Sequence, residues 1–352
     1  ARDNDLYLTY VIINPQVDRS KSAIELENNN PMMKIVDEDS EGVTVRGAKM
    51  LGTSAVMANE VFVAHLQPLR PEEVDYAISF AVPMNIPGLK ILSRKSYEKH
   101  AVSEFDNPLA SRYDENDALM YFDDVKVPWE RIFVYRDPEM CRRQFHDTPG
   151  HIYQNYQAQI RLTVKLKFLV GLAREICEVI GTVKIPSVAD SLGRMAAQAT
   201  AVENLMIGME VKGRAWGEYF VPDRHAVYAA QTLTQELYPQ MINTLRELAG
   251  GALIMLPSSS ADYDNPEVAS IIQGVQVSAD GRSDTDRVKL LKLAWDAIGS
   301  EFAGRHTQYE MFYAGAQFVT RAHSMRTYDW EGAASLVSNI TDRYDLEPGN
   351  SN

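Results

Sequence analysis

The hydrophobic pattern of this 352-residue chain changes its period once, near residue 150. Before that point, short runs rich in Val, Ile, Tyr and Phe alternate with turns that carry Pro, Gly and acidic residues, a pattern typical of β-strands. After it, apolar residues recur every four positions from Ile160 to Ile180, which is the spacing of a helix. The chain is therefore predicted to be an α+β protein, with an antiparallel β-barrel or sandwich domain over residues 1–149 and a helical domain over residues 150–352.

Four long amphipathic segments are predicted in the second domain. The first ends at Gly181, because glycine commonly stops a helix. Pro239 is expected to kink the third segment, since proline lacks the N–H of the helix ladder. The remaining three segments cover residues 187–216, residues 223–249, and a stretch from Ser283 or Asp284 towards Tyr313. Four such helices with short joins predict an antiparallel four-helix bundle.

The predicted strands of the first domain are short and separated by turns. An acid-rich turn at residues 114–117 leads into an alternating strand at residues 118–122, and a second turn and strand follow before Val127 and Pro128 end the extended run. Pro and Gly between the strands favour a compact all-β domain. The other strands are predicted at residues 6–13, 34–36, 43–45, 55–66, 76–83 and 88–93.

The composition argues against several classes of protein. The formal net charge is −13, which argues against a surface that binds nucleic acid. With two cysteines, neither a disulfide framework nor a cysteine-rich metal site is expected, and the seven histidines show no metal-binding spacing. No apolar run approaches the roughly 18 residues of a membrane span, and no signal peptide is visible. Cytoplasmic localisation without membrane contact is the prediction.

Two segments carry a resemblance to a known family. Residues 107–137 read NPLASRYDENDALMYFDDVKVPWERIFVYRD, with carboxylates around Arg112 and with aromatic residues nearby. This segment closely resembles the end of the β-domain in the oxygenase component of 4-hydroxyphenylacetate 3-monooxygenases, and residues 304–315 resemble that family's GRHxLYE…YxG signature. A charged turn is otherwise a common solvated surface, in which Arg112 would pair with Asp114. Matching segments occur in order over residues 1–20, 43–60, 105–145, 156–175 and 285–316.

The family comprises two-component phenol hydroxylases that use reduced flavin and have an acyl-CoA-dehydrogenase-like fold. The resemblance implies a monooxygenase that uses reduced FAD (FADH2) and O2 to hydroxylate a phenol, ortho to its hydroxyl, through a C4a-hydroperoxyflavin. It also implies a homotetramer and a separate NAD(P)H:flavin reductase, and this chain has no GxGxxG dinucleotide fingerprint. The family's N-terminal helical region, with its Arg and Tyr substrate clamp, is expected to be missing, because a strand pattern starts almost at Ala1.

The loop after the first predicted strand is a candidate flavin site. By resemblance, Gln16, Val17, Asp18 and Arg19 match a flavin-binding NPxxxR loop. The amide of Gln16 and the guanidinium of Arg19 suit a phosphate or the polar edge of a flavin ring. From the residues alone, a solvated turn after a strand is the commoner outcome.

Two further places are assigned to the flavin by the resemblance. Thr53 matches a threonine that faces the isoalloxazine, and its hydroxyl could bond N5 or O4 without bringing charge. The preceding Gly52 allows close approach of the backbone, although a β-bulge with locally satisfied hydroxyls is the commoner outcome for such a sequence. Gln317 and Phe318 fall on the loop that follows the GRH segment.

One departure from the family concerns substrate binding. Hydroxyphenylacetate hydroxylases carry a histidine near the end of the first strand, in the pattern LTH or FNH, whereas this chain reads Leu8-Thr9-Tyr10. A tyrosine donates a hydrogen bond but is a poor base at neutral pH, since its unperturbed pKa is about 10. Tyr10 is the candidate catalytic residue by position, and Tyr10, Leu66 and Gln67 are the candidate substrate pocket.

Three rival functions are compatible with the same scaffold. An acyl-CoA dehydrogenase would need a glutamate base that faces the flavin. A 4-hydroxybutyryl-CoA dehydratase would need iron–sulfur ligands, and its His and Cys positions on the first long helix are Gln157 and Val164 here, neither of which ligates iron. A flavin-free binding protein would lack turnover. The sequence also leaves the phenol open, from free hydroxyphenylacetate to a ring tethered to a carrier.

Overall fold

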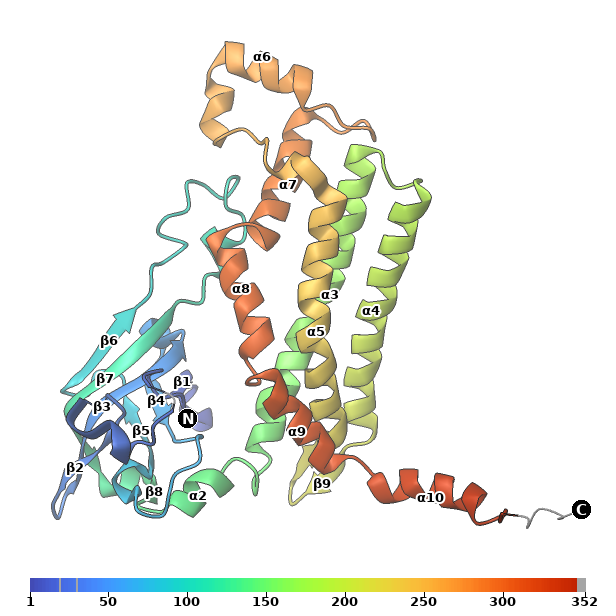
Figure 1. Ribbon diagram of the computed structural model, residues 1–352. Helices are drawn as coiled ribbons and strands as arrows, with labels where there is room; N and C mark the ends of the chain where they lie inside the picture. The colour runs from blue at the N-terminus through green and yellow to red at the C-terminus, as the bar shows by residue number, and fades with distance from the viewer. Residues whose placement is uncertain (19, 30, 347–352) are drawn as a thin grey trace, which may run out of the picture. The chain divides into compact units, whose positions relative to one another are not determined.

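The chain is seen in a computed structural model that describes residues 1–18, 20–29 and 31–346 (Figure 1). It divides into two compact units that are not continuous in sequence. The first unit comprises Ala1–His151, Val179–Gly181 and Gly250–Arg305, and the second comprises Ile152–Glu178, Thr182–Ala249 and the chain from His306 onward. The predicted order of β-sheets and then helices is confirmed, whereas the predicted domain boundary between residues 149 and 150 stays a prediction.

In the described part of the chain, the first unit contains two four-stranded sheets. One sheet has the order β1–β4–β5–β8, with the strands β1 (Leu8–Val11), β4 (Glu60–Val63), β5 (Ile78–Pro83) and β8 (Ile132–Tyr135). The other has the order β2–β3–β7–β6, with the strands β2 (Lys34–Glu38), β3 (Gly42–Thr53), β7 (Asp117–Pro128) and β6 (Leu89–Ser93). The long strands β3 and β7 pair at the centre of the second sheet.

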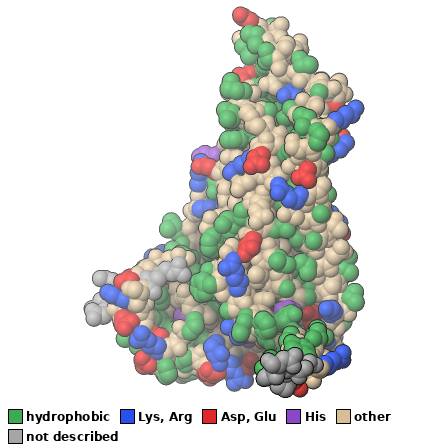
Figure 2. Space-filling view, turned by 45° about the vertical axis from the view of Figure 1, so that its right-hand side comes forward, with side chains coloured by type: hydrophobic (Ala, Val, Ile, Leu, Met, Phe, Trp, Pro, Cys, Tyr) green, Lys and Arg blue, Asp and Glu red, His purple; other side chains and the backbone are tan. Residues whose placement is uncertain are grey.

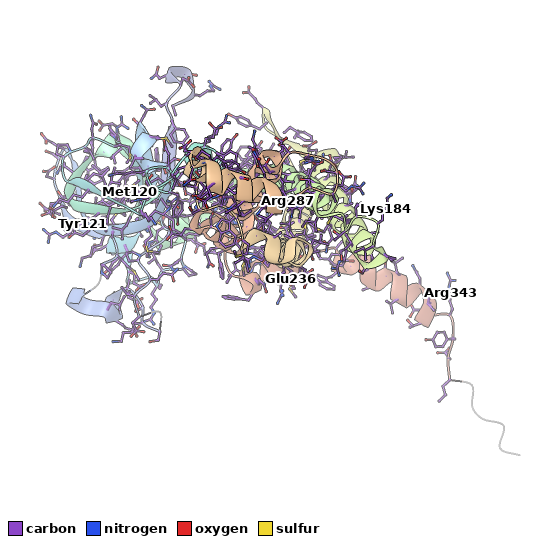
Figure 3. The ribbon with its side chains drawn as sticks, turned by 90° about the horizontal axis from the view of Figure 1, so that it is seen from above. Met120, Tyr121, Lys184, Glu236, Arg287 and Arg343 are labelled. Atoms are coloured by element: carbon purple, nitrogen blue, oxygen red, sulfur yellow. The ribbon has the colours of Figure 1, made fainter. Side chains whose placement is uncertain are left out.

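The two sheets pack face to face through an apolar core. Successive residues of a strand point to opposite faces, so on β7 Met120 is fully buried whereas Tyr121 is 38% exposed (Figure 3). The rings of Phe80 on β5 and Phe122 on β7 meet edge to face, with their centroids 5.8 Å apart. Because these strands belong to different sheets, the arrangement is a sandwich. The core also contains Val11, Val43, Val45, Val61, Val63, Ile78, Val82, Val125 and Val127.

Two details of the sheets differ from the prediction. β1 runs parallel to β4, so the structure is mixed rather than purely antiparallel. A parallel pair needs a long crossover connection, and the β2–β3 hairpin lies in that connection. The predicted second turn near residue 123 is also wrong, because β7 continues through it. Asp124 has a φ of 54°, and the register opposite it shifts between Val45 and Gly47, which identifies a β-bulge.

The segment Gly250–Arg305 belongs to the first unit and contributes a buried carboxylate to it. Asp296 lies on α7 (Asp284–Ile298) and is fully buried. Its Oδ2 accepts hydrogen bonds from the backbone N–H groups of Leu109 and Ala110, at 2.8 Å each. These donors begin the short helix α1 (Ala110–Tyr113), and the carboxylate satisfies N–H groups that the helix itself leaves unpaired.

The long helices of the second unit pack around α5. α5 (Arg224–Ala249) contacts α4 (Pro186–Val211) and α9 (Gln317–Thr327). α3 (Gly150–Ile180) is the longest helix in the described part of the chain, and α10 (Trp330–Thr341) follows α9. An apolar cluster in this unit consists of Ile152, Met209, Val221, Val227, Tyr228 and Ala230. The amphipathic periodicity therefore identified α3, α4 and α5 correctly.

The fourth predicted helix is in fact two helices, so the four-helix bundle as predicted is corrected. α7 ends at Ile298, and α8 (Glu301–Phe312) begins after Gly299 and Ser300. Ser300 Oγ accepts a hydrogen bond from the N–H of Ala303 at 3.1 Å, as an N-cap residue does. A Cβ on Gly299 would lie 2.5 Å from the Trp295 ring, so the break requires glycine.

The second predicted helix also ends earlier than residue 216. α4 stops at Val211, and Arg214–Trp216 forms the strand β9, which pairs with β10 (Tyr219–Val221). Gly217 lies in the turn between them with a φ of 59°, a backbone conformation that favours glycine. The apolar residues that extended the helical pattern therefore belong to a hairpin.

On the face shown in Figure 2, Lys and Arg are interspersed with Asp and Glu rather than gathered into a patch of one sign. Within residues 1–18, 20–29 and 31–346, no helix combines the length and the apolar character that crossing a membrane requires.

Replacement of Phe122 by alanine is expected to destabilise the protein by about 3–5 kcal/mol, because it leaves a cavity between the sheets against Phe80. Urea unfolding followed by circular dichroism measures the change. Leu92→Ala, on the neighbouring strand β6 with a 69% exposed side chain, is the control and should change stability by less than about 0.5 kcal/mol. Equal stability of the two variants would contradict the sandwich core.

Candidate active site

The predicted flavin-binding residue Thr53 lies at the end of β3, where the strand is irregular. The register against β7 shifts between Lys49 and Gly52, and Ser54 has a φ of 58°. Gly52 is buried, and a Cβ on it would lie 2.8 Å from the terminal methyl group of Met120 on β7. The β-bulge that the residues alone favoured is therefore present, and it places Thr53 opposite Asp117.

Thr53 is bonded to a carboxylate that two arginines hold. Its hydroxyl donates a hydrogen bond of 2.9 Å to Oδ1 of Asp117. Arg305 donates to the same carboxylate twice, from Nη2 to Oδ1 at 2.7 Å and from Nε to Oδ2 at 2.9 Å. Arg94 Nε donates to Oδ2 at 2.9 Å. These four residues, Thr53, Arg94, Asp117 and Arg305, are called the Asp117 cluster below.

The Asp117 cluster is largely shielded from water. The exposed fraction of the side chain is 17% for Asp117 and 10% for Arg305. Burial by itself raises the pKa of Asp117, but the hydrogen bonds from Arg305 and Arg94 outweigh it and hold the pKa well below the ordinary value of 3.8. The carboxylate is therefore ionised at neutral pH, and an ionised carboxylate can only accept hydrogen bonds.

The expectation that Arg112 pairs with Asp114 is wrong. Asp114 Oδ1 accepts a hydrogen bond from Arg94 Nη2 at 2.7 Å, whereas Arg112 lies 2.9 Å from Glu104 on the surface. Sequence reasoning missed Arg94 and Arg305 because they are 23 and 188 residues away from Asp117 along the chain. The place of Arg305 within the GRH segment was the signal that could have identified it.

A chain of hydrogen bonds that starts at the buried Lys49 fixes the start of the predicted flavin loop. Lys49 Nζ donates to Oδ1 of Asn14 at 2.7 Å, and Nδ2 of Asn14 donates to Oε1 of Gln67 at 2.8 Å. Burial lowers the pKa of Lys49 to about 7. Burial, and then the charge of Lys49, also lowers the pKa of the 2%-exposed His65. Gln67, a pocket candidate, is thereby tied to the flavin loop.

The side chains of the flavin loop itself are mostly exposed. Gln16 and Asp18 are exposed and Val17 is half-buried. Asp18 Oδ1 accepts hydrogen bonds from the hydroxyl of Ser20 at 2.6 Å and from its N–H at 3.1 Å, and these bonds lower the pKa of Asp18. Asp18 therefore stabilises the shape of the loop. Arg19, the other predicted ligand, lies outside the described residues.

The remaining pocket candidates lie on or beside neighbouring strands. Tyr10 on β1 is 37% exposed and faces away from the core, since Thr9 and Val11 on either side of it are buried. Thr9 Oγ1 donates to the carbonyl of Thr53 at 2.7 Å, so Tyr10 follows a residue that is bonded directly to the bulge. Leu66 is half-buried in the segment after β4, the strand that pairs with β1.

The second unit contains the predicted flavin ligands Gln317 and Phe318. It also contains Gln157 and Val164, which occupy the positions of the iron–sulfur ligands in the dehydratases. Gln317 and Phe318 are the first residues of α9 rather than part of a loop, which corrects the prediction. Gln317 Oε1 accepts from Arg321 at 3.2 Å, and Phe318 is 74% exposed. On α3, Gln157 Nε2 donates to the hydroxyl of Tyr313 at 2.9 Å, and Val164 is 65% exposed.

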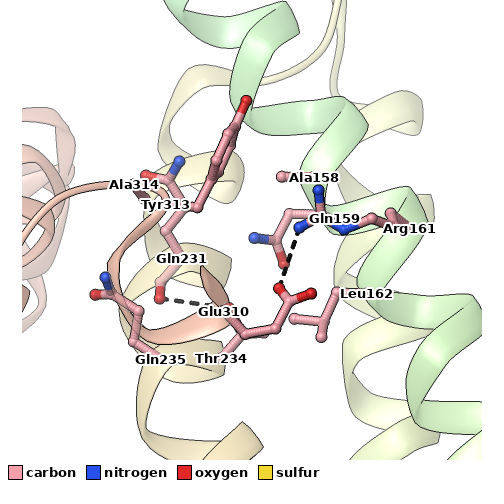
Figure 4. Close-up of a pocket in the computed structure, with 10 residues that line it drawn as sticks. All are labelled: Ala158, Gln159, Arg161, Leu162, Gln231, Thr234, Gln235, Glu310, Tyr313 and Ala314. Carbon is pink, nitrogen blue, oxygen red and sulfur yellow. Dashed lines mark hydrogen bonds and ion pairs between the residues drawn. The ribbon is translucent and has the colours of Figure 1, made fainter. Parts of the chain in front are cut away.

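The second unit also contains a small polar cavity that sequence reasoning did not identify (Figure 4). Its volume of about 20 Å³ is enough for one water molecule. Glu310 in its wall binds Arg161 Nη2 at 3.1 Å and Lys165 Nζ at 2.7 Å. Gln159 Oε1, Arg161 Nε and both amide atoms of Gln231 have no hydrogen-bond partner among the described residues. This lining suits a water-sized polar ligand.

Comparison with known proteins agrees with the resemblance. Residues 1–134 match the family model described as 4-hydroxyphenylacetate 3-hydroxylase N terminal, and residues 141–342 match the model described as 4-hydroxyphenylacetate 3-hydroxylase C terminal. The chain belongs to the 4-hydroxyphenylacetate 3-hydroxylase family. The first match ends within β8 and the second begins within α2 (Pro138–Arg143), so together they cover both the sandwich and the helices.

Individual members of the 4-hydroxyphenylacetate 3-hydroxylase family are similar over most of this chain. The oxygenase component of 4-hydroxyphenylacetate 3-monooxygenase from Pseudomonas aeruginosa is 35% identical, over 93% of this chain and 64% of the relative. The oxygenase component of 4-nitrophenol 2-monooxygenase from Rhodococcus sp. is 35% identical, over 99% of this chain and 67% of the relative. The chain thus spans about two thirds of the length of these relatives.

A solved structure in the same family has the same fold. It is the oxygenase component of 4-hydroxyphenylacetate 3-monooxygenase complexed with FAD and 4-hydroxyphenylacetate. It superposes with a TM-score of 0.90 at 29% identity, over 97% of this chain and 71% of that chain.

Lys49→Met is expected to remove a pH dependence of stability. The pKa of Lys49 is about 7 in the folded protein and 10.5 ordinarily, so the unfolded state binds more protons between these values. The free energy of unfolding of the unsubstituted protein should therefore rise from about pH 7 to about pH 10, by about 1.4 kcal/mol for each unit of pKa difference. Urea unfolding across that range measures the slope.

The matched control for Lys49→Met is Lys90→Met, because Lys90 is 65% exposed on its side chain. That variant should keep the slope of the unsubstituted protein. The loss of one hydrogen bond to Asn14 shifts the Lys49→Met curve by a constant amount, so the comparison depends on the slope alone. Parallel curves for Lys49→Met and the unsubstituted protein would show that Lys49 is charged in the folded state.

Proposed function

We propose that the chain is the oxygenase part of a two-component monooxygenase that uses reduced FAD and O2 to hydroxylate a phenol, ortho to its hydroxyl. The observation that carries the proposal is the agreement of its fold with an FAD-bound member of its own family over 97% of the chain. The relatives are named for different phenols, hydroxyphenylacetate and nitrophenol, so the proposal names the class of substrate. A phenol tethered to a carrier belongs to the same class.

The residues present fit a flavin ring. At Thr53 an uncharged hydroxyl oxygen is held at the end of a strand by its hydrogen bond to Asp117. The proposed flavin ligands are Thr53, the loop residues Gln16, Val17, Asp18 and Arg19, and Gln317 and Phe318 at the start of α9. When bound, reduced FAD supplies the electrons with which O2 is activated for hydroxylation.

The proposed substrate pocket consists of Tyr10, Leu66 and Gln67. The hydroxyl of Tyr10 would orient the substrate phenol by a hydrogen bond, and half-buried Leu66 would exclude water from one side of the ring. The amide of Gln67 is already fixed through Asn14 to buried Lys49, which holds its position before a substrate arrives. Tyr10 is proposed to position the substrate in place of the family histidine.

The proposed partners follow from membership in this family. The designation "oxygenase component" of the relatives supports a separate NAD(P)H:flavin reductase that supplies reduced FAD. A homotetramer and a cytoplasmic location are proposed by family likeness. A dehydratase function is disfavoured, because Gln157 and Val164 carry no group that binds iron. An acyl-CoA dehydrogenase or a flavin-free binding protein would yield no hydroxylated phenol, so the assay below separates both from a monooxygenase.

The direct test mixes the protein anaerobically with photoreduced FAD and then with O2 and one of several phenols. The phenols are 4-hydroxyphenylacetate, 4-nitrophenol, tyrosine and 4-coumarate. Chromatography should show a catechol product from at least one phenol, with correspondingly less H2O2. Oxidation of the flavin at its rate in free solution, with all electrons recovered as H2O2, would contradict the proposal. A flavin-free binding protein would give that result.

Thr53→Val is expected to weaken binding of reduced FAD about two- to tenfold, because it removes one neutral hydrogen bond of roughly 0.5–1.5 kcal/mol. Anaerobic fluorescence titration measures the dissociation constant. Thr44→Val makes the same substitution near the other end of the same strand and should leave the dissociation constant unchanged. Equal affinity of both variants for reduced FAD would remove Thr53 from the flavin site.

A further inference from the structure

We propose that Asp117 orients the hydroxyl proton of Thr53 so that Thr53 can only accept a hydrogen bond from a ligand, and that the site thereby selects reduced over oxidised flavin. The inference rests on the proposed function, since it assumes that the flavin ring meets Thr53. It adds a residue, Asp117, whose effect on the cofactor is exerted through another side chain.

The donor in the Thr53–Asp117 hydrogen bond is fixed by chemistry. A threonine hydroxyl has a single proton, and an ionised carboxylate has none to offer. The 2.9 Å contact between Thr53 Oγ1 and Asp117 Oδ1 therefore consumes the proton of Thr53. The lone pairs of Oγ1 remain for a ligand, and they can only accept.

Asp117 cannot easily turn away and release that proton. Its Oδ2 is held by Arg94 Nε and Arg305 Nε at 2.9 Å each, and its Oδ1 is held by Arg305 Nη2 at 2.7 Å. Three charge-assisted hydrogen bonds from two directions fix the plane of the carboxylate. The backbone of Thr53 is fixed as well, because its carbonyl accepts from the buried Thr9 hydroxyl at 2.7 Å.

An oxygen that only accepts discriminates between the redox forms of a flavin at one ring atom. N5 carries a hydrogen in reduced flavin and only a lone pair in oxidised flavin, so Thr53 would bond the first and oppose the second. The ring carbonyl O4 is an acceptor in both forms, and Thr53 in this state has no proton to give it. Of the two ring atoms that the sequence left open, the geometry therefore points to N5.

Selection of reduced flavin suits a two-component enzyme. Reduced flavin arrives from a separate reductase and oxidised flavin leaves, so the oxygenase benefits from tighter binding of the reduced form. Loss of one hydrogen bond together with the apposition of two lone pairs corresponds to a preference of about tenfold or more. A tenfold preference moves the midpoint potential of the two-electron flavin couple by about 30 mV upward on binding.

A purely structural Asp117 predicts a different result. If the Asp117 cluster only stabilised the fold, substitutions in it would weaken oxidised and reduced FAD by the same factor. The ratio of the two dissociation constants, and the potential of bound FAD, would then stay constant. The ratio is therefore the readout that separates the two roles, and it is independent of turnover.

Asp117→Asn reverses the direction of the hydrogen bond with little change in shape. The two arginine donors at the Oδ2 position favour the amide oxygen there, so Nδ2 takes the Oδ1 position beside Thr53 and loses the one hydrogen bond from Arg305 Nη2. The amide then donates to Oγ1 and frees the hydroxyl proton for the ligand. The preference for reduced FAD should fall about tenfold, and the potential of bound FAD should fall by about 30 mV.

The experiment measures dissociation constants of oxidised FAD, and of photoreduced FAD without O2, for the full chain and its variants. Thr53→Ser keeps the hydroxyl and should keep the ratio. Thr53→Val should weaken the reduced form and leave the oxidised form unchanged or tighter, and this variant tests the proposal even where Asp117→Asn fails to fold. Asp123→Asn, a surface carboxylate on the same strand β7, is the control and should keep the ratio.

The outcomes separate this inference from the proposed function. Equal weakening of both redox forms by Thr53→Val, or an unchanged ratio in folded Asp117→Asn, would overturn the redox selection while the flavin site stands. Absence of binding of either form to the unsubstituted chain would overturn the proposed function together with the inference. A preference for reduced over oxidised FAD that falls in Thr53→Val and in Asp117→Asn, but is kept in Asp123→Asn, would support the inference.

Discussion

The carboxylate of Asp117 is the interaction on which the polar organisation of the first unit depends. It connects three parts of the chain: the bulged end of β3, the segment after β6 that contains Arg94, and the beginning of α8 that contains Arg305. Buried guanidinium groups are costly without a charged partner, so removal of the carboxylate would take away a partner that two of them share. The local geometry of Thr53 is thus a consequence of a charge balance set up by residues far away in sequence.

Much of the fold could be predicted from hydrophobic periodicity, because periodicity records which face of an element is buried. It identified the strand-rich half, the long helices α3, α4 and α5, and the change near residue 150. It failed where a local contact overrides the pattern. One predicted helix is interrupted at Gly299, where the Trp295 ring leaves no room for a side chain, and the end of another is a hairpin whose turn contains Gly217. Periodicity could not predict the parallel pairing of β1 with β4, since strand order depends on contacts between distant segments.

The candidate site could be predicted only where a residue carries its own local signal. Gly52 and Thr53 stood out because glycine in a strand indicates a bulge, and the bulge is present. The assignment of Arg112 as the partner of Asp114 followed nearness in sequence and was wrong, because the arginines that bind these carboxylates come from elsewhere in the chain. The buried Lys49 gave no signal at all, since nothing in an alternating strand shows that a lysine faces inward. Long-range polar pairing is set by the fold, and periodicity does not encode it.

The discontinuity of the first unit has a consequence for how the protein is made. The sandwich strands emerge from the ribosome first, but Asp296, which caps α1, and Arg305, which completes the charge balance at Asp117, are synthesised only after three long helices. At ordinary elongation rates the sheets must wait roughly 8–30 s for these groups. During that interval Asp117 lacks the hydrogen bonds from Arg305, and the edges of the nascent sheets are open. Folding of the first unit is therefore a late event, governed by closure of a long loop, and the waiting strands are the stage most exposed to aggregation.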